Sequence, residues 1–185
     1  MKEEISVKVS QARKAYQDAD DNGKKLLESL FGKDALKPQD ITERIKTFED
    51  AMIELGENHP LVKAYHNIDA DDEDTEAYGK LRIIVAALNE GWKPDFSKDE
   101  WRYTPWFYRY TQKEYDALSE SDKAKCVLFG GNANYGAHCG FASAYSANAP
   151  SPTTAHFGSR LCLKSSSLAR YCGSQFADIW ARFYL

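Results

Sequence analysis

The side chains best suited to nucleophilic or metal chemistry in this chain are its cysteines and histidines. The four cysteines are Cys126, Cys139, Cys162 and Cys172. No two of them form a CxxC pair, and their spacings match no zinc-binding signature. Without a recognisable secretion signal, we expect reduced thiols that pack as small hydrophobic groups. The alternative is a structural disulfide, for which Cys139–Cys162 is the least implausible pair.

A histidine next to a cysteine could activate the thiol as a nucleophile, and His138 or His156 could do so for Cys139. Successive residues of an extended segment point to opposite faces, so His138 is poorly placed. Cys139 with His156 therefore stays open as an enzyme hypothesis. His59 and His66 have no acidic or thiol partner at ligand spacing, and we predict no metal site there.

An acidic run between Asp69 and Glu76 could in principle bind calcium through its carboxylates. It lacks the central glycine and the closing glutamate of an EF-hand loop. Acidic residues also suit the N-terminus of a helix, because they complement the helix dipole. We therefore predict a solvated loop that leads into a helix, with no bound metal or cofactor.

The most unusual segment is residues 130–158, GGNANYGAHCGFASAYSANAPSPTTAHFG. It has no charged residue although 28% of the chain is charged, which chance would produce in about one such window in ten thousand. It also lacks Leu, Ile, Val and Met, which cores need. Tyr, Ser, Asn and Gly are the residues of antibody paratopes. Aromatic residues recur from Tyr135 to Phe157, unlike in a flexible linker, so the segment predicts a recognition surface.

Helices are predicted throughout the first half of the chain. An amphipathic stretch from Val7 to Leu30 is interrupted by a turn at residues 20–23. A second helix begins at Asp40, which forms a capping box with Glu43, and ends at Gly56. A third helix follows from Thr75 to Gly91, with Tyr78, Leu81, Val85 and Leu88 facing inward.

The amino-acid composition changes in the second half of the chain. Dense aromatic residues between Trp92 and Tyr110 favour strands and buried platforms. Thr111 and Glu114 form a capping box for a short helix. Strands are predicted at 126–129 and 159–164, on either side of the charge-free segment. A last helix is predicted after Ser165 and Ser166, with an apolar stripe that reaches Phe183.

Several short motifs resemble the end of a C-type-lectin fold, in the version shared by formylglycine-generating-enzyme-like domains and the variable proteins of diversity-generating retroelements. The motifs are Gly130-Gly131-Asn132-Ala133, Cys139-Gly140-Phe141-Ala142, Asn148-Ala149-Pro150 and Gly158-Ser159-Arg160-Leu161. Ser159 departs from the usual phenylalanine, a helix follows Lys164, and no second cysteine stands at the spacing of the oxidising enzymes. The whole chain also resembles uncharacterised proteins of Bacteroides and their phages. That likeness is carried by Glu43–Ala51, Ala87–Trp92 and Gly158–Cys162.

The resemblance implies an α+β protein in which residues 1–91 form a helical N-terminal unit. Residues 92–185 would form a C-type-lectin-like ligand-binding domain with short antiparallel strands and a C-terminal helix. In retroelement-diversified proteins, mutagenised AAY codons cannot encode Trp, Met, Gln, Lys or Glu, and residues 130–158 contain none of them. The exposed, variable ligand-binding positions would be Asn132, Asn134, Tyr135, His138, Ser143, Tyr145, Asn148, Ser151, Thr153 and His156.

We therefore expect a non-enzymatic binding protein that presents residues 130–158 to a protein or carbohydrate ligand. The alternatives are a phage virion assembly protein that uses the same surface for subunit contacts, and an enzyme that uses Cys139 and His156. The net charge of −4 argues against nucleic-acid binding, and no apolar run approaches the ~20 residues of a membrane span. We expect a cytoplasmic protein, or a virion component if phage-encoded, with no cofactor. A homo-oligomer is compatible with the sequence.

Overall fold

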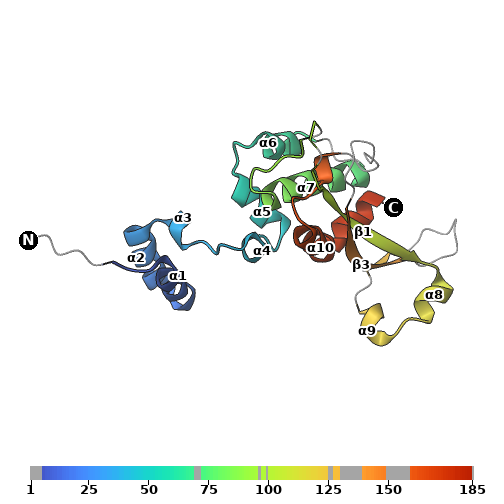
Figure 1. Cartoon of the computed structure of the whole chain (residues 1–185), viewed down its shortest axis with the longest axis horizontal. Helices are drawn as coiled ribbons and strands as arrows, with labels where there is room; N and C mark the ends of the chain where they lie inside the picture. Colours follow the sequence, from blue (N-terminus) through green and yellow to red (C-terminus); the bar gives the residue numbers. More distant parts are fainter. Residues whose placement is uncertain are drawn as a thin grey trace, which may run out of the picture. The chain divides into compact units, whose positions relative to one another are not determined.

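The protein is mostly helical in the computed structural model (Figure 1). The structure describes residues 6–68, 72–95, 97–98, 100–124, 127–129, 139–148 and 159–184. These residues belong to two compact units, Met1–Arg44 and Ile45–Leu185. The predicted α+β architecture with a C-type-lectin-like domain is wrong, because helices and not antiparallel strands predominate among the described residues of the second unit as well.

The first unit consists of short helices joined by tight turns. They are α1 (Val9–Asp18), α2 (Asp21–Phe31), α3 (Lys33–Leu36) and α4 (Ile41–Arg44). The predicted interruption near residue 20 is confirmed, since Asp20 caps α2 by accepting a hydrogen bond from the Gly23 amide at 2.8 Å. Gly32 ends α2 with a φ of 78°, a backbone conformation that favours glycine. The Tyr16 hydroxyl donates to Glu28 and joins α1 to α2.

The second unit contains the remaining helices and a small sheet. Its helical elements are α5 (Phe48–Leu55), α6 (Pro60–His66), α7 (Glu73–Leu88), α8 (Gln112–Asp116), α9 (Glu120–Lys123), the 3-10 turn η1 (Ser159–Leu161), α10 (Ser166–Gln175) and α11 (Ala177–Tyr184). Among the described residues, no helix combines the length and the apolar character that a bilayer span requires.

The helix predicted from Asp40 to Gly56 is two helices, α4 and α5, with a break between them. Thr47 begins α5 and forms a reciprocal capping box with Asp50. The Asp40 carboxylate accepts from the amide and the hydroxyl of Thr42 at the start of α4. The predicted end of the helix at Gly56 is confirmed, and its φ is 81°.

Helix α7 is the centre of the second unit, because α5, α6, α10, α11 and η1 all pack against it. Leu81, Val85 and Leu88 are buried as predicted, whereas Tyr78 is half-buried. Ile83 and Ile84 are buried too, so α7 is covered on more than the one face that an amphipathic pattern implies.

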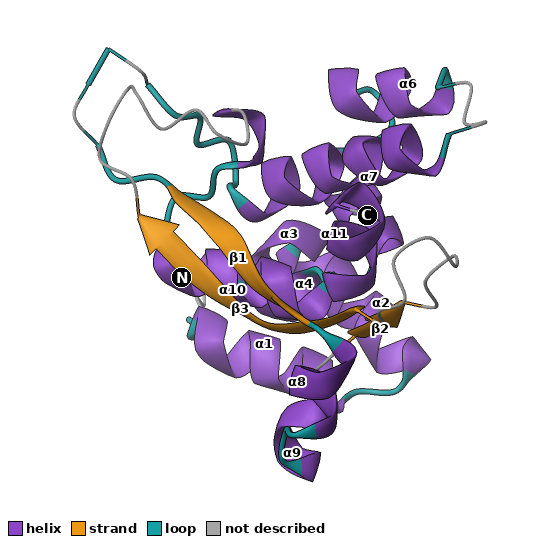
Figure 2. Cartoon of the chain, turned by 90° about the vertical axis from the view of Figure 1, so that its right-hand side faces the viewer, coloured by secondary structure: helices purple, strands orange, loops and turns teal. Residues whose placement is uncertain are grey.

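The sheet has three antiparallel strands in the order β1-β3-β2, namely β1 (Tyr103–Tyr110), β3 (Cys139–Asn148) and β2 (Val127–Phe129) (Figure 2). Helix α10 packs against β1 and β3. The strand predicted at 126–129 is confirmed by β2. The strand predicted at 159–164 is wrong, because η1 occupies its first half and only a single bridge joins Leu163 to Tyr103.

Two contacts of the C-terminal helices organise the second unit. The Phe107 ring of β1 lies 5.8 Å from the rings of both Trp180 and Tyr184, which ties the sheet to α11. The Tyr171 hydroxyl of α10 donates to the carbonyl of Ile45, where the unit begins. The division after residue 91 that the sequence suggested falls inside this unit, where α7 packs against α11.

Candidate functional site

The predicted recognition surface is only partly within the described residues. Ser143, Tyr145 and Asn148 lie on β3, the central strand of the sheet. The other predicted positions, which lie outside the described residues, are Asn132, Asn134, Tyr135, His138, Ser151, Thr153 and His156. The proposed pairing of Cys139 with His156 therefore also lies outside the described part of the chain.

The backbone of β3 is held on both sides. Tyr145 pairs with Trp106 and Asn148 pairs with Tyr103 of β1, while Cys139 pairs with Phe129 of β2. The register of β1 and β3 shifts next to Ser143, so an irregular pairing interrupts the ladder there. The expectation of an irregular stretch is therefore wrong for residues 139–148, which form a strand.

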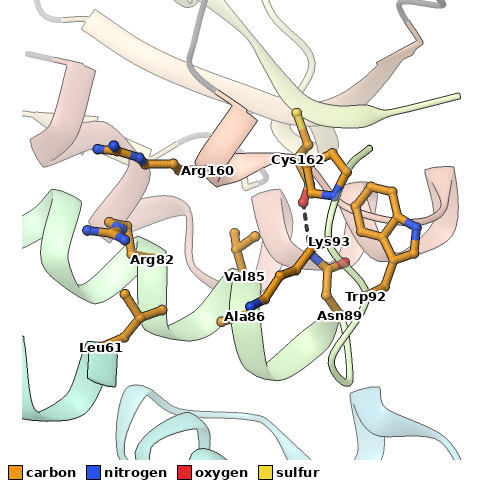
Figure 3. A pocket seen from close by; sticks show the side chains of 10 residues that line it. Leu61, Arg82, Val85, Ala86, Asn89, Trp92, Lys93, Arg160 and Cys162 are labelled. Carbon is orange, nitrogen blue, oxygen red and sulfur yellow. Dashed lines mark hydrogen bonds between the residues drawn. The ribbon is translucent and has the colours of Figure 1, made fainter. Parts of the chain in front are cut away.

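A pocket of about 260 Å³ lies elsewhere in the second unit, beside the C-terminal half of α7 (Figure 3). Its walls come from α6, from α7, from the segment that follows α7, and from the chain around η1. The apolar lining consists of Leu61, Val85, Ala86, Trp92 and Pro94. The polar lining consists of Arg82, Asn89, Lys93, Arg160 and Cys162.

Three cationic side chains line this pocket, namely Arg82, Lys93 and Arg160, and no acidic residue does. The Arg82 and Arg160 guanidinium groups lie on the same side of the pocket (Figure 3). The Arg82 guanidinium also lies 5.9 Å from the ring centroid of Tyr78, as a cation–π contact. Within the described part of the chain, none of the three cations forms an ion pair with a carboxylate.

Asn89 fixes the wall of the pocket. Its side-chain amide is buried and donates to the Cys162 carbonyl at 2.8 Å (Figure 3). It also accepts a hydrogen bond from the Lys164 amide at 3.0 Å. The end of α7 is thereby tied to the chain just beyond Arg160. The Lys164 ammonium lies 2.7 Å from the Glu90 carboxylate, so the acidic group next to Asn89 is already paired.

The Cys162 thiol belongs to a free cysteine, so the Cys139–Cys162 disulfide is not formed. Burial raises the pKa of the Cys162 thiol, and the nearby Arg102 guanidinium opposes that shift only in part. A thiol with a raised pKa is a poor nucleophile at neutral pH. The buried Arg102 side chain donates to the carbonyls of Asp95 and Lys98, at 2.6 and 3.1 Å, and so organises the loop between α7 and β1.

The pocket supplies positive charge, hydrogen-bond donors and an apolar wall, and its lining contains no His, Asp or Glu. Sequence reasoning missed Arg82 and Lys93, because the residues of the pocket are brought together from three separate stretches of the chain and share no local motif.

Metal chemistry has no support in the part of the chain that the structure covers, where no three His, Cys, Asp or Glu side chains are grouped to hold an ion. No protein-family model, no curated protein and no solved structure matches the chain.

Proposed function

We propose that the protein is a non-enzymatic binding protein whose recognition surface lies in residues 130–158. The observation that carries this proposal is the composition of the segment, which has neither charged residues nor branched aliphatic ones in a chain that is 28% charged. A buried segment needs aliphatic side chains and an ordinary solvated one needs charge. A surface that another molecule covers needs neither.

The fold supplies a frame for such a surface. The middle of the segment, residues 139–148, is hydrogen-bonded to β1 and β2 and packed against α10. Binding residues on chain segments that a rigid scaffold anchors can vary without loss of the fold. This support is independent of the lectin resemblance, because it rests on composition and on strand pairing.

The ligand class that suits this composition is a protein or a carbohydrate. Tyr135 and Tyr145 would supply contact area at a low cost in conformational entropy. Asn132, Asn148 and Ser151 would then satisfy the polar groups of the ligand. A few aromatic anchors surrounded by adaptable hydrogen-bonding groups are typical of such interfaces.

The proposal is tested by screening the full chain against a glycan array and against the proteins of the encoding cell, in parallel with Tyr145→Ala. We expect a ligand that binds the wild type and binds this variant about tenfold more weakly or worse, as is usual for an interface aromatic. Trp101→Ala is the matched control, because it removes a half-exposed aromatic side chain outside the segment. Ligands that bind both variants as tightly as the wild type would contradict the proposal.

Diversification of the surface is a separate prediction that the gene can test. We expect the codons for Ser143, Ser151 and Thr153 to end in C or T, as all Asn, Tyr and His codons do, and a near-copy of the segment to lie beside a reverse transcriptase. The measurement is the nucleotide sequence of the locus. Codons with other endings would remove the diversification hypothesis while leaving the binding proposal intact.

A further inference from the structure

The pocket beside α7 is a second site, distinct from residues 130–158, and we infer that it binds a small organic anion. Three cations line it without an acidic partner, in a chain whose net charge is −4. Cations that gather without a counter-charge repel one another, and an anionic group among them removes that repulsion. The ligand class is a phosphate or carboxylate that carries a flat apolar group.

The charged half of this ligand follows from Arg82 and Arg160. A guanidinium presents paired N–H donors that match the two oxygens of a carboxylate or the oxygens of a phosphate. Two guanidinium groups on the same side of the pocket can bind one such anion together, and Lys93 adds a third positive charge (Figure 3). The nearby Glu90 carboxylate pairs with Lys164.

The apolar half of the ligand is inferred from the apolar residues that line the pocket. Trp92 and Pro94 supply flat surfaces, and Val85 supplies an aliphatic one on the buried side of α7. The volume of about 260 Å³ lies just below the ~300 Å³ at which pockets for drug-sized molecules begin. The pocket therefore fits one ring with an anionic substituent better than a large cofactor.

The site is also held in place before a ligand arrives. The two hydrogen bonds of Asn89 fix the chain that carries Arg160, and the cation–π contact with Tyr78 positions Arg82. Side chains and backbone that are already ordered lose little entropy when the ligand binds. A small anion can therefore bind here without a change of fold.

The experiment is calorimetric titration of the full chain with phenyl phosphate and with benzoate. Comparison of the two shows whether the pocket prefers a phosphate or a carboxylate ligand. Inorganic phosphate and benzyl alcohol serve as probes for the charge alone and for the ring alone. We expect at least one ring-bearing anion to bind with a Kd of about 1 mM or tighter. Inorganic phosphate should bind more weakly, and benzyl alcohol should not bind.

Charge-removing variants place the binding in this pocket. We expect Arg82→Gln and Arg160→Gln each to weaken binding at least about tenfold, and Lys93→Gln to weaken it less. Arg170→Gln is the matched control, because it removes an exposed arginine of α10 that does not line the pocket. Circular dichroism should show all four variants folded, since each replaces a side chain that is not buried.

Two results would overturn the inference. One is the absence of binding by both ring-bearing anions up to about 10 mM, well above the expected Kd. The other is binding that Arg82→Gln, Arg160→Gln and Lys93→Gln all leave unchanged. Neither result bears on the recognition surface, because Tyr145→Ala should retain the affinity for the small anion while it loses the glycan or protein ligand.

Discussion

At the scale of single residues, Asn89 ties the end of α7 to the chain that follows Arg160. Asn89→Ala would leave the Cys162 carbonyl and the Lys164 amide without their partner. We expect a loss of about 2–4 kcal/mol in the free energy of unfolding, because each buried polar group left unsatisfied costs about 1–3 kcal/mol. Urea denaturation of the variant measures this loss.

Asn67→Ala is the matched control for this prediction. The Asn67 side chain also donates to a backbone carbonyl, that of Lys63 at 2.7 Å, but it is exposed. Water can replace an exposed hydrogen bond, so the control should lose less than about 1 kcal/mol. An equal effect of the two variants would show that Asn89 does not hold the wall of the pocket.

At the scale of elements, Gly79 decides how closely α7 packs on the segment that ends with Ile68. A Cβ at this position would lie 2.8 Å from Ile68 Cδ1 and 3.0 Å from Tyr65 Cδ2. Gly79→Ala gains about 1 kcal/mol of helix propensity, but overpacking costs about 1–3 kcal/mol. We expect net destabilisation, measured as a lower melting temperature.

A second substitution tests whether the contact with Ile68 causes the destabilisation by Gly79→Ala. Ile68→Val removes the Cδ1 methyl group that the new Cβ would meet first. The double variant should therefore lose less stability than the sum of the two single variants. Additive losses, or a Gly79→Ala protein more stable than the wild type, would contradict the close approach.

The N-terminus of α5 carries a pH dependence. Burial acts to raise the pKa of the Asp50 carboxyl, but hydrogen bonds from the Lys46 and Thr47 amides and from the Thr47 hydroxyl prevail and lower it. The unfolded chain therefore binds a proton at higher pH than the folded one. The stability that Asp50 contributes is present above the unfolded pKa and is lost as the pH falls through the folded one.

Asp50→Asn removes this titration and tests its sign. Between about pH 5 and pH 2, the wild type should lose more unfolding free energy than the variant, as followed by urea titrations at several pH values. Glu49→Gln is the control, because it removes another acidic side chain from the same first turn of α5. If the unfolding free energies of the wild type and Asp50→Asn changed in parallel with pH, the proposed contribution of the Asp50 cap would be wrong.

Local sequence signals predicted where helices begin and end better than they predicted which elements pack together. Gly56, Thr111 and Ser165 act as the sequence indicated, because capping depends on a few neighbouring backbone groups. Strand β3 was not predicted, since it has no alternating aliphatic residues and owes its conformation to pairing with β1 and β2. The pocket was not predicted either, because long-range packing brings Arg82 and Arg160 together.

At the scale of the whole molecule, the lectin-like prediction failed because it rested on short motifs between Gly130 and Leu161. Such motifs constrain a few turns, whereas the core of the second unit is built around α7. Helices from both sides of Gly91, among them α5 and α11, cover it. A division of the chain after residue 91 would separate α7 from α10 and α11, which pack against it.

The proposal that residues 130–158 are a recognition surface requires that their side chains be replaceable at little cost to the fold. The most direct test is the melting temperature of Tyr145→Ala in the full chain. An exposed residue costs less than about 0.5 kcal/mol, which corresponds to a fall of less than about 2 °C for a protein of this size. Trp180→Ala, which empties a buried position of α11, sets the scale of a core loss at about 3–5 kcal/mol. A fall for Tyr145→Ala as large as that for Trp180→Ala would mean that the tyrosine is core, and the proposed recognition surface would be wrong.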